Sequence, residues 1–140
     1  CEEVAAGDGG TCTILMVTNL AAHILLGYGS EAQKREFLVP LARGSALGAF
    51  CLTEPHAGSD ASALRTRAEK VGGHYVLNGV KQFITSGRSA QIAIVFAVTD
   101  KGAGKHGISA FVVPTSTPGY TVARLEHKSG QRSSDTALGR

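Results

Sequence analysis

The spacing of hydrophobic positions changes near residue 45 and divides the chain into two parts. In residues 1–44 the apolar positions follow helical spacing, and the longest apolar run is `CTILMVTNLAAHILLG` at 12–27. From residue 45 onward, short apolar runs and alternating segments are separated by Gly-rich turns. The pattern predicts an α+β fold, with a helical segment (1–44) followed by a β domain (45–140).

Local signals predict where the helices begin and end. An opening helix in `CEEVAA` is broken by `GDGG`, and Gly27 and Gly29 are predicted to end the long helix that follows. Ser30 opens the next helix, with Gln33 three residues later in the spacing of a capping box. Pro40 should bend or restart this helix, and Gly44 should end it.

The second part predicts five or six strands in an antiparallel barrel or sandwich. The dipeptide Asn78-Gly79, placed between `HYVL` and `VKQFIT`, predicts a tight hairpin because both central residues of that turn need positive φ. The continuously apolar run `QIAIVFAV` (91–98) is predicted to be a central strand. The other predicted strands are `LGAFCLT`, `LRTRAEKV`, `GISAFVV` and `YTVARLEH`.

Composition narrows the class of protein. A chain of 140 residues with 43% hydrophobic and 18% charged residues can bury a core and is not disordered. Its net charge of +3 is thinly spread, and no basic cluster with interleaved aromatic residues is present, which argues against nucleic-acid binding. The three cysteines lie far apart without zinc-site spacing, so no metal site is predicted and reduced thiols in a cytoplasm-like compartment are expected.

The apolar run at 12–27 is too short for a comfortable membrane span and contains Thr18, Asn19 and His23. It is therefore predicted to be a buried helix rather than a membrane segment. No basic leader followed by a small-residue cleavage site is present, so nothing in the sequence argues for secretion.

Two polar clusters are candidates for a binding site. In `CLTEPHAGSD` (51–60) a strand ends in a turn whose free backbone donors, with the side chains of Thr53, Ser59 and Asp60, would suit a phosphate or a carbonyl-rich ring. In `KQFITSG` (81–87), Phe83 and Thr85 are two apart in a strand and should share a face, which suits a flat heterocycle. The alternatives are an ordinary turn and a core phenylalanine.

Two charged features near these clusters have simpler interpretations. Glu54 follows the first predicted strand but is expected to be engaged structurally rather than to act as a base. A third cluster, `GQRSSDT` (130–136), is predicted to be a solvated loop with an ion pair between Arg132 and Asp135, worth little in water.

The order of these motifs resembles the acyl-CoA dehydrogenase family across essentially the whole chain. The most specific motifs are `LTEPHAGSD` and `NGVKQFITSG`, supported by `GSEAQKREFLVPLARG`, `AIVFAVTD`, `GISAFVVP` and `HKSGQRSSDTA`. The resemblance implies an FAD enzyme with an N-terminal helical domain, a middle β domain and a C-terminal helical bundle. This sequence matches the end of the first and most of the second, so a fragment is expected in which the C-terminal domain is absent.

The resemblance also implies roles for residues of both clusters. Thr53 corresponds to the threonine that binds the pyrimidine end of the flavin, and Ser59 to a serine that contacts the FAD pyrophosphate and the acyl-CoA. Phe83 replaces a usual tryptophan against the isoalloxazine, keeping a stacking face without the indole N–H, and Thr85 lies near flavin N5. The full predicted cofactor-binding set is Phe50, Cys51, Leu52, Thr53, Gly58, Ser59, Phe83, Ile84 and Thr85.

The reaction implied by the resemblance is α,β-desaturation of an acyl-CoA thioester, with electrons passing to an electron-transfer flavoprotein. In most family members the catalytic glutamate lies on the C-terminal domain, so no catalytic residue is predicted here and this polypeptide alone is expected to be inactive. Tetramers are common in the family, and a bacterial cytoplasm or a mitochondrial matrix would suit it. Two alternatives remain: an oxidase or monooxygenase of the same superfamily, and a β module without enzymatic activity.

Overall fold

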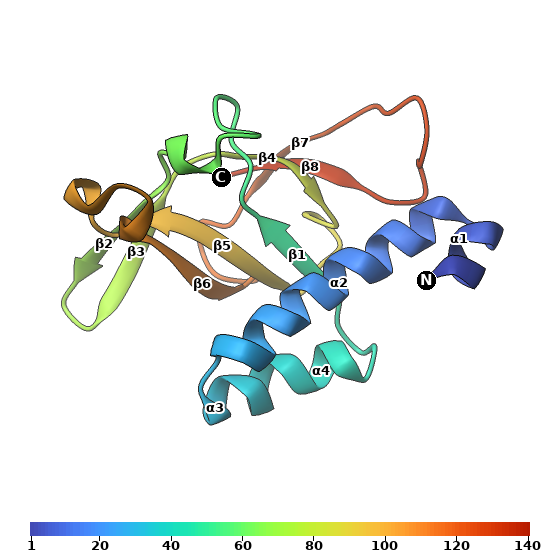
Figure 1. Cartoon of the computed structure of the whole chain (residues 1–140), viewed down its shortest axis with the longest axis horizontal. Coiled ribbons are helices and arrows are strands. Elements are labelled where there is room, and N and C mark those ends of the chain that lie inside the picture. The colour runs from blue at the N-terminus through green and yellow to red at the C-terminus, as the bar shows by residue number, and fades with distance from the viewer.

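The computed structural model describes residues 1–140 as a helical layer packed on two β-sheets (Figure 1). The helices precede the strands, which confirms the predicted α+β class. The helical elements are α1 (Glu2–Gly7), α2 (Gly9–Tyr28), α3 (Glu31–Gln33), the π-helical η1 (Lys34–Leu38) and α4 (Val39–Ala42). The strands are β1 (Gly48–Cys51), β2 (Arg67–Val71), β3 (His74–Asn78), β4 (Lys81–Thr85), β5 (Ile92–Val98), β6 (Ile108–Pro114), β7 (Val122–Leu125) and β8 (Thr136–Gly139).

The helix boundaries follow the predicted capping chemistry. The Ser30 hydroxyl accepts from the Gln33 amide, while the Gln33 side chain accepts from the Ser30 amide, so the capping box is confirmed. Pro40 does not stop the helix but follows a π-helical turn, in which the Val39 amide donates to the Lys34 carbonyl. Since proline has no N–H to continue the regular ladder, this wider turn lets the helix pass through Pro40.

The strands form two sheets rather than a closed barrel. In the larger sheet the order is β1-β5-β2-β3, with β6 also paired to β5, and the smaller sheet has the order β4-β8-β7. The central position predicted for `QIAIVFAV` is confirmed, since β5 has partners on both sides. The expectation of purely antiparallel pairing is corrected, because β5 runs parallel to β1 and, at one residue pair, to β2.

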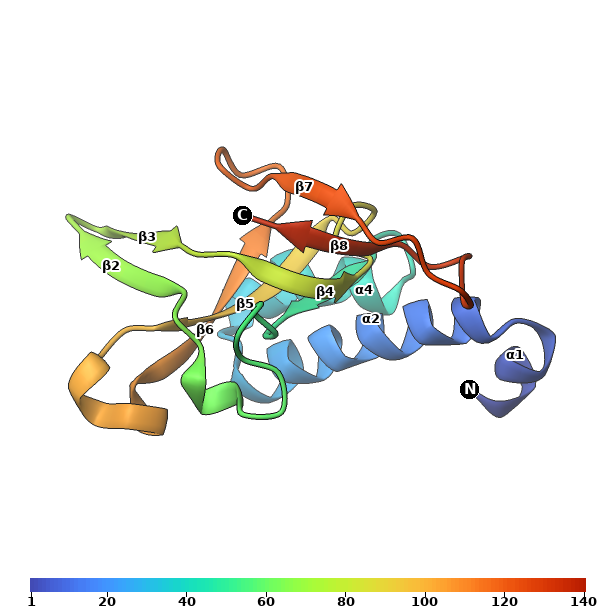
Figure 2. The ribbon, with the colours of Figure 1, turned by 90° about the horizontal axis from the view of Figure 1, so that it is seen from above.

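The predicted Asn78-Gly79 hairpin is wrong. β3 pairs with β2 across a turn that contains Gly72 at φ 59°, whereas β4 pairs with β8 in the other sheet. Figure 2 shows the chain running on from β3 into β4, so residues 79–80 cross between sheets instead of reversing direction. Glycine is required there by a close approach, because a Cβ on Gly79 would lie 2.7 Å from Thr66 Cα.

Two apolar clusters hold the layers together. One, including Ala21, Leu25 and Ile94, joins α2 to the larger sheet, and the other, including Cys51 and Ile84, lies between the two sheets. α2 also packs on β1 through Thr18, whose hydroxyl accepts from the Gly48 amide at 3.2 Å.

Helix α2 is buried on one side only, which corrects the expectation of a buried helix. Its apolar residues Leu15, Met16, Leu20 and Leu26 are exposed. By length and composition alone, α2 would be able to cross a membrane.

We predict that Gly79→Ala destabilises the protein by about 1–3 kcal/mol, because the new methyl group must displace the Thr66 backbone. Gly73→Ala is the matched control, since a Cβ there would meet no atom within 4 Å. Chemical denaturation of both variants checks this, and equal unfolding free energies would contradict the crossing geometry.

Candidate functional site

The turn after β1 lies directly beside β4, so the structure brings the first two predicted clusters together. The Thr53 carbonyl accepts from the Gln82 amide at 2.9 Å. Glu54 and Ala57 exchange backbone hydrogen bonds of 2.9 and 3.1 Å, which close a tight turn over the two residues between them. Asp60 then caps the 3₁₀ turn η2 (Ala61–Ala63) by accepting from the Ser62 amide at 3.1 Å.

A buried ion pair fixes this arrangement from inside. The Lys81 ammonium lies 2.8 Å from the Glu54 carboxylate, and the two side chains are only 8% and 2% exposed. The carboxylate also accepts from the Arg65 and Thr66 amides at 2.6 and 2.9 Å, while the ammonium donates to the Leu52 carbonyl at 3.0 Å. The pair therefore connects the end of β1, the segment before β2 and the start of β4. The structural role expected for Glu54 is confirmed.

Both groups of the pair have shifted pKa values. Burial by itself raises the pKa of Glu54, but hydrogen bonds from Lys81 and from the backbone amides outweigh it and lower the pKa to about 2. Burial also lowers the pKa of Lys81, and Glu54 opposes that shift. The carboxylate is therefore ionised at neutral pH and unsuited to remove a proton.

Several groups around this junction have no partner within the chain. The hydroxyls of Thr53, Ser59 and Thr85 make no intramolecular hydrogen bond, and neither does the Thr53 amide. The Phe83 ring is 58% exposed. A β-bulge interrupts the pairing of β4 between Lys81 and Ile84, and Phe83 has a φ of 59°, which is strained for an aromatic residue. We call Thr53, Ser59, Phe83 and Thr85 the candidate cofactor face.

This donor set fits a flavin. An exposed aromatic ring offers a surface for a flat heterocycle, and hydroxyl and amide donors beside it can bind the ring's polar edge. The absence of competing partners for Thr53 and Thr85 within the chain leaves these donors available to a ligand.

The other residues predicted to bind cofactor lie differently. The side chains of Cys51 and Ile84 are buried between the sheets, so only their backbone could reach the candidate cofactor face. Phe50 is half-buried and packs on Phe96 with ring centroids 5.1 Å apart. Leu52 is half-buried, and Gly58 is exposed in the turn.

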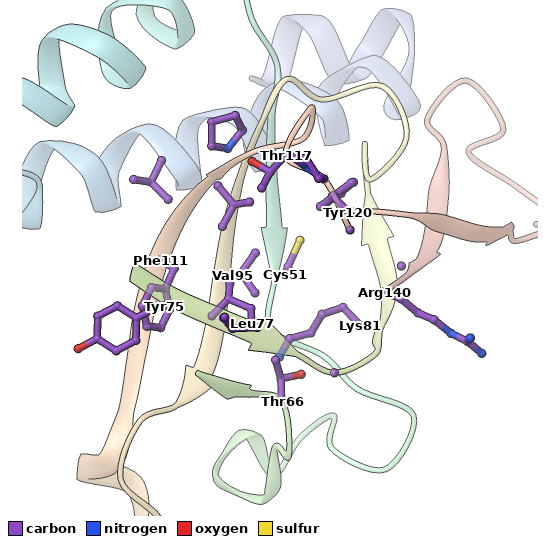
Figure 3. A pocket seen from close by; sticks show the side chains of 18 of the residues that line it. Cys51, Thr66, Tyr75, Leu77, Lys81, Val95, Phe111, Thr117, Tyr120 and Arg140 are labelled. Carbon is purple, nitrogen blue, oxygen red and sulfur yellow. The ribbon is translucent and has the colours of Figure 1, made fainter. Parts of the chain in front are cut away.

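A separate cavity of about 450 Å³ lies between the two sheets (Figure 3). Cys51 and Ile84 line it, but no member of the candidate cofactor face does. Its polar wall is largely engaged, since the Tyr120 hydroxyl donates to the Gly87 carbonyl at 2.8 Å and Lys81 is paired. Burial raises the pKa of the Cys51 thiol to about 12, so this cysteine is not a nucleophile at neutral pH.

The third predicted cluster has a structural role. The Asp135 carboxylate accepts from the Arg88 and Ser89 amides at 3.1 and 3.0 Å and so fixes the turn after β4. Arg132 donates instead to the Lys128 carbonyl at 2.8 Å. The predicted Arg132–Asp135 ion pair is therefore wrong. No group of three or more His, Cys, Asp or Glu side chains is placed to hold a metal ion.

Comparison with known protein families gives two matches that together cover nearly the whole chain. The model of the acyl-CoA dehydrogenase middle domain matches residues 49–138, and that of the acyl-CoA dehydrogenase N-terminal domain matches residues 1–45.

Individual relatives agree with these matches. A short-chain specific acyl-CoA dehydrogenase of Megasphaera elsdenii is 51% identical over 96% of this chain and 36% of its own length. A structure of the electron transferring flavoprotein of Acidaminococcus fermentans gives a TM-score of 0.92 and 46% identity over 94% of this chain and 35% of that one. The structure of a glutaryl-CoA dehydrogenase of Mycobacterium smegmatis in complex with FADH2 gives a TM-score of 0.89 and 43% identity over 98% of this chain and 34% of that one. This chain thus spans about a third of the length of the relatives that it matches.

We predict that Glu54→Gln in the full-length protein lowers the unfolding free energy at pH 7 by about 3–5 kcal/mol, because it leaves the Lys81 charge buried without its partner. The folded pKa of Glu54 lies below its usual value of 4.5, so its contribution is present above pH 4.5 and is lost as pH falls towards 2. The difference in unfolding free energy between wild type and variant should therefore shrink as the pH falls from 4.5 to 2, which denaturation measured over a series of pH values checks.

Glu31→Gln serves as the control, because Glu31 forms an exposed pair with Lys34. Losing that pair should change the unfolding free energy little. A constant difference between wild type and Glu54→Gln from pH 7 to pH 2 would contradict the assigned charge state.

Proposed function

This chain belongs to the acyl-CoA dehydrogenase family, and on that basis we propose that the protein binds FAD and catalyses α,β-desaturation of acyl-CoA thioesters. The observation that carries the proposal is the hydrogen bond from the Gln82 amide to the Thr53 carbonyl. It holds the two family motifs edge to edge, so that Thr53 and Phe83 can contact one ligand.

Each member of the candidate cofactor face has a part in the proposal. The Thr53 amide and hydroxyl bind the pyrimidine end of the flavin, and the Phe83 ring lies against the ring system. Thr85 donates near the reactive edge, and Ser59 contacts the pyrophosphate and the acyl-CoA. The free donors of Thr53 and Thr85 and the exposed ring of Phe83 support these roles.

When bound, the flavin supplies the acceptor for the hydride that leaves the substrate β carbon. The residues of this chain bind and orient, while Glu54 is excluded as the base that removes the α proton because it is already held by Lys81 and two backbone amides. That base lies outside these 140 residues in the proposal. An electron-transfer flavoprotein is the proposed electron acceptor, and the intact protein is proposed to be a homo-oligomer.

The proposed substrates are acyl-CoA thioesters, with short chains to be tested first because a short-chain specific enzyme is 51% identical to this chain. The three cysteines are free, which suits a reducing compartment such as a bacterial cytoplasm or a mitochondrial matrix.

We predict that the full-length protein is yellow and that butyryl-CoA bleaches its flavin absorbance under anaerobic conditions. A protein purified without flavin absorbance, and unable to take up added FAD, would rule out the proposal. Rapid hydrogen peroxide formation with butyryl-CoA in air would instead identify an oxidase.

We predict that Thr53→Val and Thr85→Val each weaken FAD binding about 2- to 10-fold, since each removes one hydrogen bond worth about 0.5–1.5 kcal/mol. Fluorescence titration of the apoprotein with FAD measures the effect. Thr121→Val is the matched control, because Thr121 lies beside β7, the far strand of the smaller sheet, and its hydroxyl has no intramolecular partner. Unchanged affinity in both test variants would favour a β module whose motifs are only turns.

A further inference from the structure

We propose that Lys81 and Glu54 are positioning residues that set the reduction potential of the bound flavin through the Leu52–Thr53 peptide. This inference rests on the proposed function, because it requires a flavin at the candidate cofactor face. It adds to that function two residues that lie behind the face and do not themselves touch the cofactor.

The geometry starts from a single peptide group. Lys81 Nζ donates to the carbonyl of Leu52 at 3.0 Å, and the amide on the other side of that peptide bond belongs to Thr53. The chain has no cis peptide, so the Thr53 N–H points away from the Leu52 carbonyl, and away from the ammonium bound to it. The Thr53 N–H has no partner in the chain. A buried cation therefore lies one peptide group behind a free donor of the candidate cofactor face.

In this arrangement the buried charge polarises the peptide group in a defined direction. A hydrogen bond from an ammonium polarises the peptide that accepts it and strengthens the N–H at the opposite end. Both side chains are almost completely buried, so water screens their charges weakly. The positive charge favours the reduced, more electron-rich flavin, while the carboxylate of Glu54 partly cancels that effect.

The other charged groups nearby do not change the direction in which the ion pair is expected to shift the reduction potential. His56 Nε2 lies 3.4 Å from the Glu54 carboxylate and is partly exposed. Arg65 contributes only its backbone amide to the pair. Because two backbone amides remain on Glu54 when the lysine is removed, the carboxylate keeps hydrogen bonds that favour its charged form.

The two single variants therefore have opposite effects on the flavin, although both weaken the fold. Lys81→Met removes the cation and leaves the carboxylate, so the reduction potential should fall. Glu54→Gln removes the negative charge that opposes the cation, so the potential should rise as long as Lys81 keeps its proton, which its hydrogen bond to the Leu52 carbonyl favours. The double variant removes both charges and should return close to the wild-type value. A merely structural role would move both single variants in the same direction or neither.

The experiment is a spectroelectrochemical titration of the flavin in the full-length holoprotein at pH 7.5. The reduction potential of the flavin should shift by at least about 30 mV, downward for Lys81→Met and upward for Glu54→Gln. For a two-electron couple, this shift equals a tenfold change in the protein's affinity for reduced flavin relative to oxidised flavin. Lys34→Met is the matched control, because Lys34 forms an exposed pair and should leave the potential unchanged.

Glu54→Gln decides the question alone if Lys81→Met does not fold. Shifts of the same sign, no shift, or loss of flavin from a folded Glu54→Gln protein would overturn the inference. Wild-type protein that binds no flavin would instead refute the proposed function, so the two failures are distinguishable.

Discussion

The buried ion pair between Glu54 and Lys81 is the interaction on which the candidate site depends. It joins residues 27 apart in sequence and, with its backbone hydrogen bonds, fixes three segments at one point. Two charges taken from water are stable only when their remaining hydrogen-bonding groups are satisfied. Here the carboxylate has two amide donors and the ammonium has a carbonyl acceptor, so the same bonds that satisfy the pair also position the backbone on either side of Thr53.

The passage of the chain from one sheet to the other makes this junction possible. β3 and β4 are consecutive in sequence but belong to different sheets, and the crossing at Gly79 brings the start of β4 against the end of β1. The two sides of β4 then differ in character. Ile84 packs in the core between the sheets, whereas Phe83, at a bulge with positive φ, is exposed. The strained conformation of Phe83 coincides with the surface that we assign to the cofactor, as expected where function constrains the backbone.

Local chemistry was predictable from the sequence, and long-range pairing was not. The capping box at Ser30, the central strand predicted at 91–98 and the structural engagement of Glu54 all follow from residue type and spacing, and all are confirmed. Asn78-Gly79 failed as a hairpin signal because the close approach of Thr66, not a turn, requires glycine there. The partner of Glu54 was missed because it lies in another strand. A lysine at position 81, the first residue of the strand `KQFIT`, was the only available signal. Likewise Asp135 binds amides after β4 rather than its neighbour Arg132, a choice that depends on tertiary structure.

The central claim is that the Glu54–Lys81 pair holds the end of β1 against β4, and amide hydrogen exchange tests it most directly. In the full-length protein, Lys81→Met should reduce the protection of the Gln82 amide, which donates to Thr53, while the Arg65 and Thr66 amides, which still donate to Glu54, and the amides of the β5–β6 pairing keep theirs. Retained protection at Gln82 in a folded Lys81→Met protein would show that β1 and β4 stay together without the pair, and would contradict the account.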